Sequence, residues 1–203
     1  MDSTLEVRVP HTAEMTDDAP ARKQRLRAEL LAARRARSAS VRDSAGEAIA
    51  AHGIESCRGA TTVAAYLAVE HEPPTLLLLD TLRSHGVQVL LPVIDGVGLD
   101  WAPYAGPAGL APGPLGLSEP STPRLGVEAA SAADVVVVPA LAVDRLGNRL
   151  GRGRGFYDRA LINVSAPVIA VVYDDELVDE VPAEPHDRRV DAVLRPGGFT
   201  PVG

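Results

Sequence analysis

The 203-residue sequence contains a single cysteine, a single lysine and no apolar run of membrane-spanning length. Because Cys57 has no partner in the chain, an intramolecular disulfide is excluded, and we expect a protein of the reduced cytoplasm. No segment approaches the ~20 apolar residues of a membrane span, and the start of the chain lacks the apolar core of a signal peptide. We therefore expect no membrane partner, a disordered tail over residues 1–19 and a single domain over residues 20–203.

Positive charge is also in short supply, since the net charge is −7 at pH 7. An acidic chain of this kind is not typical of a nucleic-acid-binding protein. Its basic residues gather in an amino-terminal helix and in one glycine-rich segment. This distribution predicts a local site for a small anionic ligand.

Glycine and arginine are concentrated in residues 141–158. Arg149, Arg152 and Arg154 supply forked, permanently charged donors suited to phosphate oxygens. Asp158 is a hard oxygen ligand that could hold Mg²⁺ against the same phosphates. The segment therefore predicts a cradle for a nucleoside triphosphate, because glycines let successive N–H groups converge on one phosphate. These glycines are Gly147, Gly151, Gly153 and Gly155.

The context of this segment separates it from the Gly-Arg repeats of disordered RNA-binding tails. An apolar strand pattern over residues 134–143 precedes it, and a short helical pattern over residues 156–162 follows. A strand, a glycine loop and a helix amino terminus form a recurrent phosphate site. The segment has neither the Gly-Lys-Ser/Thr of a Walker loop nor the Gly-x-Gly-x-x-Gly spacing of a dinucleotide fold.

The remaining pattern alternates helices and strands, which predicts a three-layer α/β sandwich with a mainly parallel sheet. Gly53 is expected to close the second helix and Gly86 the third. A Pro/Gly-rich stretch, residues 103–123, is too long for an ordinary connection and is interpreted as a functional loop. We expect helices over residues 21–37, 41–51 and 75–85, and strands over residues 61–67, 87–91, 99–101, 168–172 and 190–194.

The motif in residues 139–144 and 147–158 resembles the signature of the 5-formyltetrahydrofolate cyclo-ligase family, also called methenyltetrahydrofolate synthetases. Three weaker blocks agree in order and spacing, at residues 23–27, 66–75 and 181–187. The chain departs from the family pattern at two positions. Phe156 stands where the first of two tyrosines is usual, and Arg154 occupies a position often held by Gly or Lys.

This resemblance implies a NagB/RpiA/CoA-transferase-like fold and an ATP- and Mg²⁺-dependent C–N ligase that acts as a monomer. The implied reaction closes 5-formyltetrahydrofolate to 5,10-methenyltetrahydrofolate and releases ADP and phosphate. An amide oxygen is a poor leaving group, so the formyl oxygen is first phosphorylated. Nitrogen 10 of the folate then attacks the activated carbon. Such chemistry requires charge neutralisation and alignment more than a strong base.

The resemblance also implies roles for particular residues. Arg149, Arg152 and Tyr157 are the implied catalytic residues, and both arginines are expected to be solvated. The implied metal ligands are Asp158 and Asp187. The implied folate contacts are Leu67, Glu72, Arg152 and Phe156, with Glu72 facing the amino and N–H donors of the pterin. The implied ATP contacts are Lys23, Arg27, Arg149, Leu150, Gly151, Arg152, Gly153, Arg154, Gly155, Phe156 and Tyr157.

Several of these residues also have a purely structural interpretation. Lys23 and Arg27, at i and i+4, would also suit an ordinary solvated basic face. Glu72 would suit a cap before the third helix, Asp158 a favourable position at a helix amino terminus, and Asp187 a solvated turn. Leu67 would suit the core.

Four further residues carry weaker signals. Trp101 and Tyr104 could stack on the folate, although packing is the more common role of an aromatic residue in a sheet. Asp144 is expected to shape the turn before the glycine loop. His186 could act as an acid or base beside Asp187, but a histidine in a surface loop is the simpler interpretation.

Two other functions stay open on the sequence. One is an ATP- or phosphate-sensing protein that has lost turnover. The other is a different enzyme of the same architecture, such as a sugar-phosphate isomerase or a CoA-transferase relative. Glu72 discriminates between these and the cyclo-ligase, because it is the residue assigned to the folate.

Overall fold

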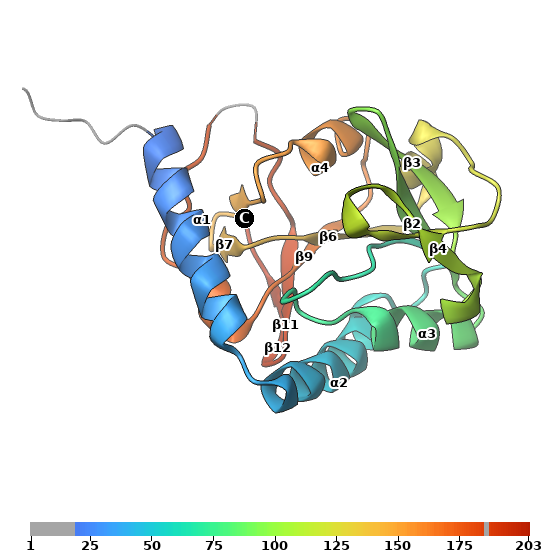
Figure 1. Ribbon diagram of the computed structural model, residues 1–203, viewed down its shortest axis with the longest axis horizontal. Coiled ribbons are helices and arrows are strands. Elements are labelled where there is room, and N and C mark those ends of the chain that lie inside the picture. Colours follow the sequence, from blue (N-terminus) through green and yellow to red (C-terminus); the bar gives the residue numbers. More distant parts are fainter. Residues whose placement is uncertain (1–18, 185–186) are drawn as a thin grey trace, which may run out of the picture.

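The computed structural model describes residues 19–184 and 187–203, so residues 1–18 of the predicted tail and His186 lie outside the described residues. Its centre is a seven-stranded sheet in the order β12-β11-β9-β6-β1-β2-β3 (Figure 1). The five inner strands run parallel, and β3 and β12 pair antiparallel at the two edges. The strands are β1 (Thr62–Ala64), β2 (Gln88–Asp95), β3 (Gly98–Pro103), β6 (Val135–Pro139), β9 (Val168–Val171), β11 (Ala192–Arg195) and β12 (Gly198–Pro201).

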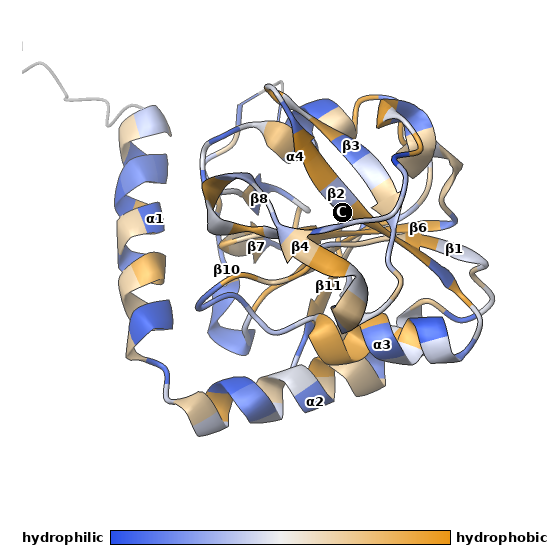
Figure 2. Cartoon of the chain, turned by 45° about the vertical axis from the view of Figure 1, so that its right-hand side comes forward, coloured by the Kyte–Doolittle hydropathy of each residue, from blue (hydrophilic) through white to orange (hydrophobic). Residues whose placement is uncertain are grey.

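Alternation along the inner strands produces a core on each face of the sheet. Val137 and Ile169 belong to one apolar cluster, whereas Val136 and Val168 belong to the other. Successive side chains of a strand point to opposite faces, so a strand that is apolar throughout must be covered on both. Figure 2 shows apolar residues concentrated on these strands. The predicted α/β class with a mainly parallel sheet is confirmed.

Helices α2 (Ala39–Ser56) and α3 (Leu76–Ser84) cover one face. The prediction that Gly53 ends the second helix is wrong, because α2 continues through it to Ser56. A Cβ at Gly53 would lie 2.7 Å from Leu78 Cδ1 and 3.1 Å from Leu194 Cδ2. Gly53 therefore permits close packing of the helix against α3 and β11. Gly86, with φ +82°, does follow the end of α3 as predicted.

The opposite face is covered by shorter pieces, namely the 3-10 turn η3 (Val127–Ala132) and α4 (Phe156–Ala160) with the turn that follows it. Trp101 is fully buried in this second core, and Tyr104 is buried in the first, where its hydroxyl donates to Asp80 at 2.9 Å. Both aromatic residues are packing residues and neither lines the pocket described below. The alternative that they stack on a ligand is therefore wrong.

The predicted strand over residues 134–143 is split between two sheets. It leaves the central sheet after β6 and enters a three-stranded sheet of β10 (Leu177–Val178), β7 (Ala142–Asp144) and β8 (Arg149–Leu150). Helix α1 (Ala19–Ala36) packs on this small sheet through Leu26, Leu30 and Leu31. Figures 1 and 2 show α1 at one side of the molecule, beside the small sheet.

The Pro/Gly-rich stretch contains regular structure that its composition concealed. It forms a β-hairpin of β4 (Leu110–Pro112) and β5 (Ser118–Pro120), with 3-10 turns η1 (Pro107–Gly109) before it and η2 (Pro114–Gly116) at its tip. Glu119 fastens the hairpin to β2 by accepting a hydrogen bond from the Ile94 N–H at 2.8 Å.

The predicted strands over residues 61–67 and 190–194 shorten to β1 and β11. The edge strand β12 was missed. Across residues 19–184 and 187–203, no helix combines the length and apolarity that crossing a membrane requires.

Candidate active site

A cavity of about 790 Å³ opens between α1, the glycine loop, residues 66–72 and the tip of the β4–β5 hairpin. Every residue for which the resemblance implies a site role lies in its wall. They are Lys23, Arg27, Leu67, Glu72, Arg149, Leu150, Gly151, Arg152, Gly153, Arg154, Gly155, Phe156, Tyr157, Asp158 and Asp187. The structure thus brings together residues that are up to 164 positions apart in the chain.

The glycine loop is held from beneath by Asp144. Its buried carboxylate accepts hydrogen bonds from the N–H groups of Leu146, Asn148 and Val181, so the prediction that it shapes this turn is confirmed. Gly147 has φ +78°, and a Cβ there would lie 2.4 Å from the Val190 carbonyl oxygen. Only glycine fits a backbone so placed. The base of the loop is therefore rigid, while Arg152, Gly153 and Arg154 at its rim are exposed.

Arg149 differs from the expectation of a solvated arginine. Its side chain is only 4% exposed, and it donates to Asp158 Oδ1 at 2.5 Å. Asp158 lies in the first turn of α4, as the structural alternative required, but it is also the ion-pair partner of Arg149. Among the described residues the Nε of Arg149 has no hydrogen-bond partner. Arg149 thus combines a structural contact with a free donor.

Helix α1 places two cations in the cavity wall. The Lys23 ammonium donates to Asp187 Oδ2 at 2.6 Å and to Glu184 Oε2 at 2.7 Å. Burial lowers the pKa of Lys23, but these two hydrogen bonds outweigh it and the net pKa is raised. Arg27 donates to the Gly151 carbonyl at 2.9 Å. Lys23 is buried, so the alternative that it lies on a solvated basic face is wrong. Asp187 is paired with Lys23, so the alternative that it lies in a solvated turn is also wrong.

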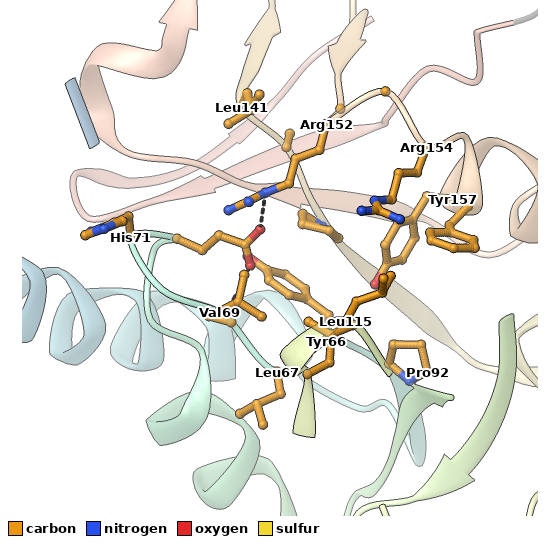
Figure 3. A pocket seen from close by; sticks show the side chains of 18 of the residues that line it. Tyr66, Leu67, Val69, His71, Pro92, Leu115, Leu141, Arg152, Arg154 and Tyr157 are labelled. Atoms are coloured by element: carbon orange, nitrogen blue, oxygen red, sulfur yellow. Dashed lines mark hydrogen bonds and ion pairs between the residues drawn. The ribbon is translucent and has the colours of Figure 1, made fainter. Parts of the chain in front are cut away.

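Glu72 lies on the opposite wall, in the segment between β1 and α3. It is only 7% exposed, and Oε2 accepts the Val69 N–H at 3.0 Å. Its Oε1 is 3.0 Å from Arg152 Nε, the contact drawn as a dashed line in Figure 3. Glu72 does not cap α3, because the N-cap residue is Thr75. The Tyr173 hydroxyl donates to the Glu72 carbonyl at 3.3 Å and holds this segment from behind.

Two tyrosines, Tyr66 and Tyr157, line the same cavity as Arg152 (Figure 3). Burial, followed by the negative charge of Glu72, raises the pKa of both Tyr66 and Tyr157, so each is a neutral hydrogen-bond donor. Among the described residues the Tyr66 hydroxyl has no partner. Tyr66 directly precedes Leu67 in the block of residues 66–75, yet its residue type and position did not predict a site role.

Apolar side chains complete the half of the cavity nearest the hairpin. Leu67, Pro92 and Phe156 line it, and Leu115 reaches it from the hairpin tip. Leu115 is 58% exposed and has φ +59°, a conformation that leucine rarely adopts. No signal in the sequence identified Leu115, because its role depends on a hairpin hidden in a stretch interpreted as an irregular loop. An apolar wall facing a cationic loop suits a ligand pair with a flat ring and a phosphate chain.

The two predicted metal ligands do not form a closed metal cage. Within residues 19–184 and 187–203 there is no group of three or more His, Cys, Asp or Glu side chains arranged to hold a metal ion. Asp158 and Asp187 nevertheless line the same cavity as hard oxygen donors. Mg²⁺ typically binds one or two carboxylates together with substrate phosphates and waters. The donor set therefore fits a magnesium ion that enters with a nucleotide.

Comparisons with known proteins agree with this geometry. The sequence model of the 5-formyltetrahydrofolate cyclo-ligase family matches residues 19–196. A 5-formyltetrahydrofolate cyclo-ligase of Mycolicibacterium smegmatis is 48% identical over 87% of this chain and 95% of its own length. The Escherichia coli K12 enzyme of the same description is 34% identical over 68% of this chain and 79% of its own. The NMR structure of Aquifex aeolicus 5,10-methenyltetrahydrofolate synthetase superposes with a TM-score of 0.77 at 26% identity, covering 88% of this chain and 92% of that one.

Proposed function

Because the chain belongs to the 5-formyltetrahydrofolate cyclo-ligase family, we propose that the cavity between α1 and the glycine loop is its active site. The protein is an ATP-dependent ligase of folate metabolism that closes 5-formyltetrahydrofolate to 5,10-methenyltetrahydrofolate. The observation that carries the assignment is the division of one cavity into a cationic rim and an apolar wall with a buried carboxylate. These two parts suit the triphosphate and the pterin respectively.

In the first step the formyl oxygen attacks the γ-phosphorus, and the bond to the β,γ-bridging oxygen breaks to release ADP. Negative charge moves onto the bridging oxygen as this bond breaks. Arg149 and Arg152 are placed to neutralise it, since both line the cavity. The N–H groups of the glycine loop hold the transferring group in line. Preorganised donors of this kind contribute most where charge develops.

In the second step nitrogen 10 of the folate attacks the activated formyl carbon. The carbon–oxygen bond then breaks, phosphate leaves, and the nitrogen loses its proton to give the methenyl bridge. Glu72 orients the pterin by accepting its amino and N–H donors, and Phe156 and Leu67 support the ring system. Tyr157 provides a neutral hydroxyl beside the reacting groups, because its raised pKa keeps it protonated.

Asp158 and Asp187 would hold the magnesium ion of the nucleotide. The ion supplies charge neutralisation to the phosphates. In this arrangement Arg149 and Lys23 fix the positions of the two carboxylates.

The test is formation of methenyltetrahydrofolate, followed by its absorbance with 5-formyltetrahydrofolate in the presence and absence of ATP and Mg²⁺. We expect product only with the complete mixture, and one ADP for each methenyl group formed. Product without ATP, or ADP without product, would contradict the phosphorylation step. We further propose that the protein acts in the cytoplasm as a monomer, since one chain supplies the whole cavity wall.

A further inference from the structure

Two side chains of the proposed active site contact each other in the absence of ligands. Arg152 is proposed to bind ATP phosphate, beside the folate contact that the resemblance implies, and Glu72 is proposed to bind the pterin, yet Arg152 Nε lies 3.0 Å from Glu72 Oε1. Among the described residues, this is the ion pair that bridges the glycine loop and the segment between β1 and α3 (Figure 3). While the pair is intact, each side chain is engaged away from its ligand.

The partners of this pair differ in how firmly the protein holds them. The Arg152 side chain is 44% exposed and lies on the exposed rim of the glycine loop, so it can turn toward a phosphate. Glu72 is 7% exposed and is fixed by the Val69 N–H and by Tyr173. A triphosphate offers several anionic oxygens to a forked guanidinium and is therefore the stronger partner. If Arg152 leaves, Glu72 becomes a buried carboxylate that requires new donors.

The group beside Glu72 also points to a ligand. The hydroxyl of Tyr66 is buried without a hydrogen-bond partner among the described residues, and Glu72 is close enough to influence its ionisation. A buried polar group without a partner is destabilising, so it calls for a functional explanation. A hydroxyl donor next to a carboxylate acceptor matches the edge of a pterin-4-one, which presents an acceptor beside two donors.

We propose that the Arg152–Glu72 ion pair couples the two substrates, because nucleotide phosphates draw Arg152 away and expose Glu72 and Tyr66 to the pterin. The inference rests on the proposed function, since it uses the same two ligands. Breaking the ion pair costs free energy, which reduces the affinity for the substrate that binds first. The second substrate binds to a protein in which the ion pair is already broken, so its affinity is not reduced in this way. By thermodynamic linkage, each substrate must then raise the affinity for the other by the same factor.

The expected size of this coupling factor follows from the burial of the two paired side chains. A half-exposed arginine on a buried carboxylate lies between the weak exposed pairs and the strong buried ones. We therefore expect a coupling factor on the order of tenfold, which is within the usual range for linked sites.

The experiment is isothermal titration calorimetry of the full chain with 5-formyltetrahydrofolate and with a non-hydrolysable ATP analogue plus Mg²⁺. Each ligand is titrated alone and then into protein saturated with the other. In the unaltered protein we expect each ligand to bind about tenfold more tightly when the other is present.

Two variants test the pair directly. In Glu72→Gln the arginine is released, so the ATP analogue alone should bind about tenfold more tightly than to the unaltered protein, while folate binds more weakly. In Arg152→Gln the ATP analogue should bind more weakly. In both variants the coupling factor should fall to about one. The control is Arg154→Gln, because Arg154 is an exposed cation of the same loop that makes no ion pair with Glu72 within the described residues. This substitution should weaken binding of the ATP analogue and leave the coupling factor unchanged.

The sign of the Glu72→Gln effect on nucleotide binding is decisive. Unchanged or weaker binding of the ATP analogue to a folded Glu72→Gln protein would overturn the inference, as would an unaltered protein without coupling. Such results, obtained with protein that still forms methenyltetrahydrofolate, would leave the proposed function intact. Absence of the methenyl product from the unaltered protein would instead refute the proposed function. Thermal melting of each variant excludes loss of fold as the cause.

Discussion

Arg149 and Arg152 lie three positions apart, each forms an ion pair in which one partner is buried and the other partly exposed, and we expect removal of either arginine to destabilise the protein. The side chains of Arg149 and Asp158 are 4% and 34% exposed, and those of Arg152 and Glu72 are 44% and 7% exposed. Breaking a fully buried ion pair costs about 3–5 kcal/mol and breaking an exposed pair about 0–1 kcal/mol. Because Asp158 keeps contact with water, we place Arg149→Ala between these limits, at about 1.5 kcal/mol. For a chain of this length that is a fall in Tm of roughly 3–6 °C.

The measurement is urea denaturation followed by far-ultraviolet circular dichroism, without nucleotide, beside steady-state kinetics with ATP varied. Arg149→Ala should lower both stability and ATP use. Arg152→Ala should impair ATP use and lower stability by a similar amount, because the tenfold coupling factor inferred above corresponds to about 1.4 kcal/mol. Adding Asp158→Ala to Arg149→Ala should recover part of the lost stability, since it removes the unpaired carboxylate. An Arg149→Ala protein as stable as the unaltered protein would refute this reasoning.

Four further predictions concern single positions. Asp158→Asn keeps the shape of the side chain but removes its charge, so the magnesium concentration for half-maximal activity should rise. An unchanged magnesium titration would mean that Asp158 only pairs with Arg149 and does not bind the metal. Gly53→Ala should destabilise the protein by about 1–2 kcal/mol in urea denaturation, because a Cβ would press on buried Leu78; a stabilised variant would mean that the leucine moves aside. Leu115→Ser should raise the KM for folate severalfold with little change in the KM for ATP, and equal effects would contradict an apolar contact with the ring. The ion pairs raise the pKa of Lys23 above 10.5, so the contribution of Lys23 to stability is present at neutral pH and is lost as the pH rises through the raised pKa. Urea denaturation of Lys23→Met should therefore show a smaller loss of stability at alkaline pH than that of the unaltered protein.

Local pattern was enough to locate much of the site. The strand, glycine loop and short helix around Arg149 and Asp158 follow each other directly in the chain, and their residue types alone predict a phosphate site. The helical spacing of Lys23 and Arg27 likewise predicted a shared face, and both line the cavity. Such features depend on neighbours within a few residues.

Features that depend on distant contacts could not be predicted. Gly53 looked like a helix terminator, because the side chains of Leu78 and Leu194 that require its small size are far away in the sequence. The contact between Arg152 and Glu72 joins residues 80 positions apart and depends on the sheet order. The burial of Arg149 follows from its place on β8, a two-residue strand too short to leave a periodic signal.

The pairing of Lys23 with Asp187 and Glu184 has a practical consequence, because Lys23 is the only lysine in the sequence. Reagents that acylate or reductively alkylate amines can modify one side chain, which lies in the wall of the cavity, and its burial and raised pKa will slow that reaction. The other primary amine of the chain is the α-amino group. Mass spectrometry of the labelled protein would therefore report occupancy of the cavity at a single atom, without an engineered probe.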